Sequence, residues 1–203
     1  MTAVAVVDHG AGNLVSIAAA LERAGADVRI VSDPDALADA AAVVLPGVGA
    51  VAAAMRGLRR TGMDAALAAW DGPLLGICVG LQVFFERSEE DGAVGLGLVA
   101  GTVERLSGRP LPHMGWNDVV HDGDPLFAGI PPGEPFYFVH SYAPVPDDAA
   151  VVAATTDHGG SFVSAVRAGR RVGVQFHPER SGWAGARLLE NFLAEVEGAA
   201  DAA

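Results

Sequence analysis

The sequence of 203 residues contains a single cysteine, Cys78, and this scarcity narrows its possible chemistry. One cysteine cannot form an internal disulfide framework or a cysteine-based zinc site. No uninterrupted apolar segment reaches the length of a membrane span. Residues 1–7 place no basic region ahead of a long apolar one, so no signal peptide is predicted. We therefore expect a cytoplasmic protein with no metal and no cofactor.

Positive charge is also scarce. The sequence has 13 Lys and Arg residues against 25 Asp and Glu residues, so its formal net charge is −12 and its pI is near 4.7. Such a charge repels phosphate backbones and anionic lipids, so neither nucleic acid nor a membrane is expected as the main partner. With 51% apolar residues, the chain has enough material for the core of one globular domain.

The first half of the sequence alternates between two periodicities. Four apolar runs are typical of strands buried on both faces: residues 3–7, 28–31, 41–45 and 73–77. Four other segments have the apolar spacing of helices: residues 14–25, 51–58, 63–70 and 79–87. Repeated strand, glycine turn and helix predicts an α/β fold with a mostly parallel central sheet flanked by helices.

From Gly92 onward the pattern changes to additional β structure. Six segments resemble strands linked by short turns: residues 98–106, 118–121, 136–143, 151–155, 162–167 and 172–176. The last predicted helix covers residues 185–196, and we expect the tail 198–203 to be disordered. No segment is long enough to link two domains, so residues 1–203 are predicted to form a single domain.

Cys78 lies between a predicted strand and a predicted helix, with Gly76 and Gly80 two positions away on either side. Glycines at these positions allow the sharp turn of a nucleophile elbow, which exposes the central side chain at the end of the strand. The start of a helix also stabilises a thiolate. The alternative is a cysteine that packs as a small hydrophobic residue, and the elbow pattern alone leaves both interpretations open.

A cysteine that catalyses acyl transfer needs a base and a group that orients the base. Of the six histidines, only His177 combines the end of a predicted strand with a nearby carboxylate, that of Glu179. A glutamate bound to one ring nitrogen would fix the tautomer and support the imidazolium. For this pair taken alone, a capping histidine beside a surface glutamate is the better explanation.

The reaction also needs donors for an oxyanion, and the segment Pro46-Gly47-Val48-Gly49 could supply them. It directly follows a predicted strand, and its glycines free the backbone to point N–H groups into a pocket. Pro-Gly turns after strands are common, so this signal is weak by itself. The segment lacks the glycine spacing and the Lys-Ser/Thr ending of a phosphate-binding loop.

Together, these three segments resemble the class I glutamine amidotransferases, in which they occur in the same order. Within that family, further segments are similar to the glutaminase subunits of imidazole glycerol phosphate synthases, enzymes of histidine biosynthesis. These segments are residues 8–13, 46–49, 112–117 and 136–142, together with residues 173–179 followed by Ser181 and Gly182. The resemblance extends from Val4 to Phe192 and implies a single class I glutamine amidotransferase domain.

The resemblance implies a reaction and a role for particular residues. Cys78 attacks the side-chain amide of L-glutamine, His177 protonates the departing ammonia, and Glu179 orients His177. Water then hydrolyses the γ-glutamyl thioester. The resemblance also implies the oxyanion residues Val48, Gly49 and Val79, the substrate-binding residues Gly47, Gln82, Glu90, Ser141 and Tyr142, and the interface residues Asn13, Tyr137 and Arg180.

The resemblance further implies a partner. The ammonia would pass to a cyclase subunit with a (β/α)8 barrel, which forms imidazole glycerol phosphate and an aminoimidazole carboxamide ribotide. Four residues depart from the usual pattern: His9 and His158 replace Tyr, Leu81 replaces Met, and Arg180 replaces Lys. Only Arg180 affects an implied role, because arginine and lysine differ in donor geometry. The alternatives are an amidotransferase that serves another acceptor and a binding protein without turnover.

Overall fold

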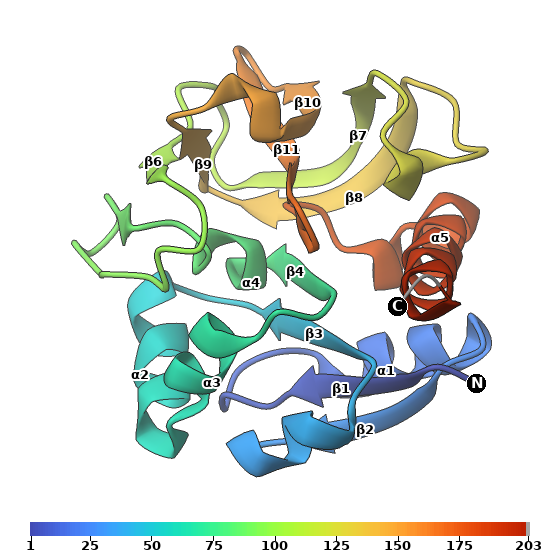
Figure 1. Cartoon of the computed structure of the whole chain (residues 1–203). Helices are drawn as coiled ribbons and strands as arrows, with labels where there is room; N and C mark the ends of the chain where they lie inside the picture. The colour runs from blue at the N-terminus through green and yellow to red at the C-terminus, as the bar shows by residue number, and fades with distance from the viewer. Residues whose placement is uncertain (202–203) are drawn as a thin grey trace.

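A nine-stranded sheet forms the centre of the computed structural model, which describes residues 1–201 (Figure 1). Its strand order is β2-β1-β3-β4-β12-β11-β10-β7-β8. The first five strands in this order are parallel: β2 (Asp27–Val31), β1 (Ala3–Val7), β3 (Ala42–Gly47), β4 (Leu74–Cys78) and β12 (Arg171–Val174). Because they are parallel, their carboxyl ends meet at one edge of the sheet, where ligands bind in such folds.

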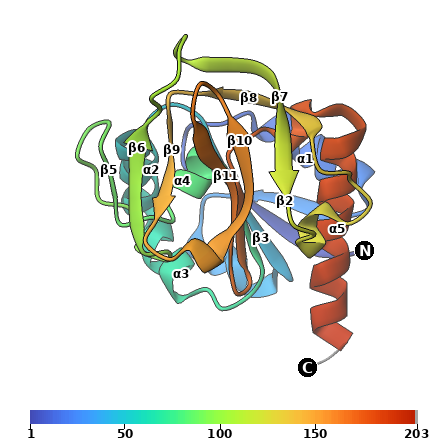
Figure 2. The ribbon, with the colours of Figure 1, turned by 90° about the horizontal axis from the view of Figure 1, so that it is seen from above.

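Helices cover both faces of the parallel strands. In Figures 1 and 2, α1 (Leu14–Arg23) and α5 (Gly182–Asp201) lie on one face, and α2 (Val51–Thr61) and α3 (Met63–Ala69) lie on the other. Every residue of β3 and β4 is buried between these layers, which explains their continuous apolar runs. The predicted α/β fold with a mostly parallel central sheet is confirmed.

The second half of the chain supplies the predicted extra β structure. Four antiparallel strands complete the large sheet: β7 (His113–His121), β8 (Glu134–His140), β10 (Val152–Asp157) and β11 (Ser161–Ala168). A separate three-stranded sheet contains β5 (Arg87–Ser88), β6 (Gly101–Arg105) and β9 (Tyr142–Pro146). Short 3-10 helices cover residues Pro34–Asp39, Pro125–Phe127, Ala149–Val151 and Pro178–Arg180.

The helix predicted for residues 79–87 is much shorter in the structure, where α4 covers Val79–Gln82. The carbonyl groups of residues 83–86 accept hydrogen bonds from the backbone of residues 95–99 instead of from the next helical turn. For example, Leu98 N donates to Phe84 O at 2.7 Å. Bonds to a distant segment replace the local ones that a longer helix needs.

The strand predicted for residues 136–143 is interrupted at Ser141. Before Ser141, β8 pairs with β7 in the large sheet, and after it β9 pairs with β6 in the small sheet. The chain therefore changes sheets at this residue. This break places Ser141 and Tyr142 beside the carboxyl ends of the parallel strands, where both residues line the cavity that contains Cys78.

The chain end also differs from the prediction, because α5 continues to Asp201 through a segment that was expected to be disordered. Ala and Glu, which favour helices, follow Leu193, and Thr2 Oγ1 donates a 2.6 Å hydrogen bond to Glu197 Oε1. Residues 202 and 203 of the expected tail lie outside the described residues. Within residues 1–201, no helix has both the length and the apolar composition needed to cross a membrane.

One ionic cluster joins three segments of the second half of the chain. The Arg167 guanidinium of β11 binds Asp124 through two 2.7 Å contacts and Glu195 of α5 through contacts of 2.8 and 3.0 Å. Burial would raise the pKa of Asp124, but the hydrogen bonds from Arg167 and Leu126 N, together with the charge of Arg167, outweigh burial and lower it. Both carboxylates would therefore lose a charged partner if Arg167 were removed.

We expect Arg167→Met to lower the free energy of unfolding by about 2–3 kcal/mol, because it leaves two partly buried carboxylates unpaired. Urea denaturation measures this change. Arg187→Met is the matched control, since Arg187 pairs with Glu190 at 3.2 Å on the exposed surface of α5. Its loss should cost no more than about 0.5 kcal/mol. Equal losses in the two variants would contradict a special role for the Arg167 cluster.

Candidate active site

Cys78 is the last residue of β4 and directly precedes α4. Its φ of 55° is the only positive value outside glycine in the described chain. A Cβ on Gly76 would lie 2.7 Å from the Gly80 oxygen, and a Cβ on Gly80 would lie 1.7 Å from the Leu45 oxygen. Both positions therefore require glycine. The predicted elbow is confirmed, and its strained central residue is the candidate nucleophile.

Strand register brings the other predicted segments to Cys78. Gly47 at the end of β3 pairs with Cys78 at the end of β4. On the opposite side of β4, Val174 pairs with Ile77, so the residues after β12 continue alongside Cys78. Parallel pairing thus gathers segments from residues 47, 78 and 177 at one edge of the sheet.

His177 and Glu179 form a buried pair. His177 Nδ1 lies 2.9 Å from Glu179 Oε1, and the two side chains are 6% and 5% exposed. The hypothesis of a histidine beside a surface glutamate is therefore wrong. Burial lowers the pKa of His177, but the adjacent Cys78 and Glu179 outweigh it and raise the pKa to about 10. At neutral pH this favours an imidazolium beside Cys78.

The position of His177 is fixed through its backbone. Its N–H donates to Tyr137 O at 2.9 Å, and its carbonyl accepts a hydrogen bond from Ser181 Oγ at 2.6 Å. The same hydroxyl oxygen accepts from Tyr137 N at 3.0 Å. Strand β8 therefore holds the candidate base in place, and Ser181 closes the arrangement from the other side.

A cavity of about 250 Å³ opens over Cys78 and His177. Seven more of the predicted site residues line it: Val48, Gly49, Val79, Gln82, Glu90, Ser141 and Tyr142. The remaining lining residues were not predicted: Pro112, Val139 and His140. Gly47 lies beside Cys78 but does not line the cavity, and a Cβ on it would lie 3.0 Å from the Val79 side chain.

The predicted oxyanion residues have backbone N–H groups without protein acceptors. Neither Val48 N nor Gly49 N donates to a group in residues 1–201. Val79 is the first residue of α4, so its N–H has no acceptor within the helix. His9 Nε2 donates to Pro46 O at 2.8 Å and so holds the start of the 46–49 segment.

Comparison with known proteins identifies this arrangement. The family model of the class I glutamine amidotransferases matches residues 5–196. The chain belongs to this family. The matched residues include the Cys78 elbow, the buried His177–Glu179 pair and the residues that line the cavity.

Individual curated relatives show a similarity more specific than the family. The chain is 50% identical over 195 residues to the imidazole glycerol phosphate synthase subunit HisH of Herpetosiphon aurantiacus, covering 94% of this chain and 93% of the relative. It is 48% identical over 196 residues to HisH of Dehalococcoides mccartyi, covering 94% and 96%. A putative GMP synthase protein from Thermoplasma acidophilum has the same fold, with a TM-score of 0.78, 21% identity and coverage of 100% and 97%.

His140 lines the cavity and begins a series of hydrogen bonds that continues to His113, outside the cavity. His140 Nδ1 lies 2.9 Å from Tyr142 O, which can only accept, so His140 carries its proton there. His140 Nε2 then accepts from His113 Nδ1 at 3.0 Å, and His113 Nε2 accepts from Asn117 Nδ2 at 3.1 Å. Burial, above all, lowers the pKa of His140 to about 3. His140 is therefore neutral and fully bonded, and cannot replace His177 as the base.

Glu90 lies at the rim of the cavity. Its side chain is exposed, and its pKa is raised, first by partial burial and then by the neighbouring Asp91. The carboxylate can reach a cation at the cavity mouth without being enclosed by protein. Its position is compatible with the predicted contact to the ammonium group of a substrate.

The predicted interface residues lie outside the cavity. The Arg180 guanidinium carbon stands 4.1 Å from the centre of the Tyr137 ring, and Trp116 packs edge-on against that ring at 6.2 Å. Trp116 is exposed. Two other apolar side chains that lie near Trp116 and Arg180 in the sequence, Met114 and Trp183, are also exposed. Asn13 caps α1, with its side chain accepting from Ser16 N at 3.3 Å.

Exposed Trp116, with 56% of its surface accessible, was missed in the sequence analysis. Successive side chains of a strand point to opposite faces, and this alternation could have indicated from the sequence that Trp116 is exposed. In β7, residues with even numbers from 114 to 120 are more exposed than their neighbours. Large apolar side chains on an outward face indicate a binding surface.

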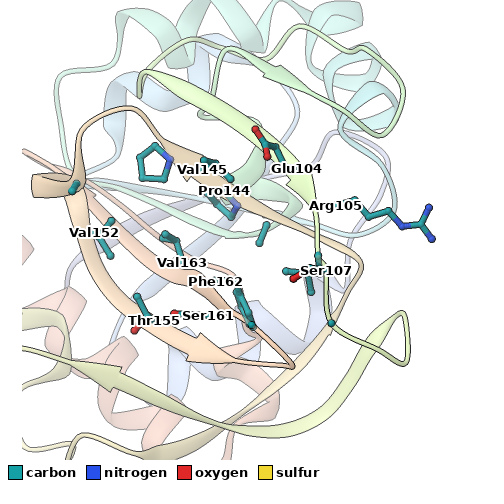
Figure 3. Close-up of a pocket in the computed structure, with 16 residues that line it drawn as sticks. Glu104, Arg105, Ser107, Pro144, Val145, Val152, Thr155, Ser161, Phe162 and Val163 are labelled. Atoms are coloured by element: carbon teal, nitrogen blue, oxygen red, sulfur yellow. The ribbon is translucent and has the colours of Figure 1, made fainter.

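A larger cavity of about 500 Å³ lies apart from Cys78, between the small sheet and strands β10 and β11 (Figure 3). Val152, Val163 and Phe162 line it, and the Arg105 side chain points away from it. None of the described residues that line it is a cysteine or a histidine. Size alone therefore does not identify the candidate active site, which is the smaller cavity lined by Cys78 and His177.

Proposed function

We propose that this chain is the glutaminase subunit of an imidazole glycerol phosphate synthase. It hydrolyses L-glutamine to glutamate and ammonia in the cytoplasm and passes the ammonia to a (β/α)8 cyclase subunit. The cyclase forms imidazole glycerol phosphate and an aminoimidazole carboxamide ribotide in histidine biosynthesis. The observation that carries this proposal is the Cys78 elbow beside the buried His177–Glu179 pair, in a chain about half identical to HisH proteins.

The first chemical step forms a thioester. The Cys78 thiolate attacks the side-chain amide carbon of glutamine and creates a tetrahedral oxyanion. The N–H groups of Val48 or Gly49, together with that of Val79, are the proposed donors to this oxyanion, because none has a protein acceptor in the described chain. For Val48, we propose that donation follows rotation of a peptide in the 46–49 segment.

The second step releases ammonia. The His177 imidazolium donates its Nε2 proton to the leaving nitrogen as the carbon–nitrogen bond breaks. Neutral His177 then takes a proton from water, which attacks the thioester and releases glutamate and the Cys78 thiolate. The raised pKa of His177 supports this order, since it keeps the proton in place until the leaving group accepts it.

Recognition of glutamine is proposed for the cavity wall. Both hydrogens of Gln82 Nε2 are used, one by Tyr142 O at 2.9 Å and one by Gln175 Oε1 at 3.1 Å. Its Oε1 accepts no hydrogen bond in residues 1–201 and is not fully enclosed. Gln82 therefore accepts from an N–H group of the substrate. Glu90 is the proposed partner of the ammonium group, and Ser141 supplies further polar contacts.

The region around Tyr137 is the proposed contact with the cyclase. It presents the exposed Trp116 and the charged Arg180 together, a combination common in the centres of protein interfaces. The backbone of Tyr137 also bonds to His177 N. A partner that binds this surface would therefore lie close to the candidate base.

The test is glutamine hydrolysis by the chain alone, with the cyclase subunit, and with the cyclase and its nucleotide ligand. We expect weak hydrolysis alone, because the proposed mechanism includes a rotation in the 46–49 segment, and an increase of about 5- to 150-fold in the full complex. The mismatched control replaces the cyclase with the subunit of an anthranilate synthase that normally receives ammonia from its own glutaminase. Full turnover without a partner, or no response to the cyclase, would contradict the proposed subunit function.

A further inference from the structure

The Cys78 sulfur has a hydrogen-bond donor that the proposed mechanism leaves unused. Gln175 follows β12 and is fully buried, with 0% of its surface exposed. Its Nε2 lies 3.6 Å from Cys78 Sγ. Thiolates accept hydrogen bonds, and bonds to charged groups are stronger than those between neutral groups. A buried amide aimed at the candidate nucleophile is therefore more than a packing residue.

The direction of this amide follows from its neighbours. Tyr142 O can only accept, so Gln82 must present Nε2 to it, at 2.9 Å. The same nitrogen lies 3.1 Å from Gln175 Oε1 and donates to it. The oxygen of Gln175 thus faces Gln82, and its nitrogen faces Cys78.

The anchoring carbonyl is itself held from a second side. Tyr142 O also accepts from His140 Nδ1 at 2.9 Å, and the bonds that follow through His113 fix the tautomer of each ring. The Tyr142 carbonyl is consequently restrained by two donors. Rotation of the Gln175 amide would break its bond with Gln82 and leave buried polar atoms without partners, which is costly.

We propose that Gln175 stabilises the Cys78 thiolate by donating a hydrogen bond to it, and that Tyr142 O, acting through Gln82, holds Gln175 in the donating orientation. This inference rests on the proposed function, because it requires Cys78 to be the nucleophile. An amide does not lose its proton, so this bond differs from a contact with His177, which gives up a proton during the reaction.

The donor is expected to matter most when the sulfur leaves. Formation of the thioester removes the negative charge from sulfur and weakens the hydrogen bond. Hydrolysis of the thioester breaks the sulfur–carbon bond, returns the electron pair to sulfur and restores the bond to Gln175. Stabilising the departing thiolate lowers the barrier of this second step.

The test is alkylation of the full chain with iodoacetamide, which reacts with thiolates, over a range of pH. Gln175→Met removes the donor at similar volume. We expect the pH of half-maximal alkylation to rise by about one to two units in this variant. Gln175→Glu keeps an acceptor for Gln82 but places a carboxylate at the sulfur. We expect a larger rise in this variant, because like charges repel.

The Gln175→Met variant separates donation from simple positioning. If Gln175 only oriented Gln82, this variant would raise KM for glutamine through the proposed substrate contact of Gln82 and would leave the alkylation profile of Cys78 unchanged. Steady-state kinetics in the complex with the cyclase gives a second readout. Loss of the donor should lower kcat about tenfold or more, with little change in KM for glutamine.

Ser164→Ala is the matched control. Ser164 is fully buried, its carbonyl accepts from Gln175 N at 2.9 Å, and its hydroxyl has no hydrogen-bond partner in residues 1–201. Its alkylation profile should match the wild type. If both Gln175→Met and Gln175→Glu fold and give the wild-type alkylation profile, the inference about Gln175 is wrong, while the proposed function is unaffected. If a glutamine-like electrophile failed to label Cys78 in the wild type, the proposed function itself would fail.

Discussion

Replacing Cys78 with serine is expected to abolish glutamine-dependent synthesis by the complex with the cyclase, while synthesis from added ammonium salts continues. The thiolate is needed only to release ammonia, and a serine hydroxyl at the same position is not ionised at neutral pH. We expect glutamine-dependent activity to fall by about 10³-fold or more, as for other nucleophiles of catalytic triads. Formation of imidazole glycerol phosphate from each nitrogen source provides the measurement.

Serine is preferred to larger residues because it keeps the backbone of the elbow close to its native state. Residue 78 has φ 55° and is almost fully buried, so a bulky side chain could unfold the site. The control is Ser164→Ala, a substitution at a buried residue that does not line the cavity. Loss of both activities in a folded Cys78→Ser complex would count against the division of labour between the subunits.

The sequence was sufficient to predict the elbow because its determinants are local. Gly76 and Gly80 flank Cys78, and the structure shows that a side chain at either position would collide with backbone atoms. The burial of Glu179 could not be inferred in the same way. It depends on residues 178–180 forming a 3-10 turn that packs against β8, a strand that lies much earlier in the sequence.

Other features required the tertiary structure. The end of α4 at Gln82 depends on backbone donors from residues 95–99. The role proposed for Gln175 depends on Gln82 and Tyr142, which approach it from two other elements. In the sequence, Gln175 is only a polar residue near the end of a predicted strand. Only its partners show that its nitrogen is directed at Cys78.

Glu179→Gln is expected to lower glutamine hydrolysis by about 10²–10⁴-fold and to change its pH dependence. Glu179 Oε1 lies 2.9 Å from His177 Nδ1, and this carboxylate contributes to raising the pKa of His177 to about 10. A neutral glutamine removes that contribution, so the pKa of His177 must fall. The proposed mechanism needs the imidazolium to protonate the leaving nitrogen, which departs as ammonia.

The direction of the pH effect follows from this requirement. In the wild type, the imidazolium persists as pH rises until it deprotonates near pH 10, so the alkaline decline of kcat should lie there. In Glu179→Gln the same decline should begin at lower pH, and part of the activity should return as pH falls. The pH profile of kcat in the complex with the cyclase measures both limbs.

Glu190→Gln is the matched control, because Glu190 is an exposed glutamate of α5 that pairs with Arg187 at 3.2 Å. It should leave both kcat and the alkaline limb unchanged. An unshifted limb in Glu179→Gln would show that the carboxylate only orients the ring, because orientation changes the rate without changing the pKa of His177. A shifted limb with the expected loss of rate would assign both tasks to Glu179, the stabilisation of the imidazolium and its direction toward the leaving ammonia.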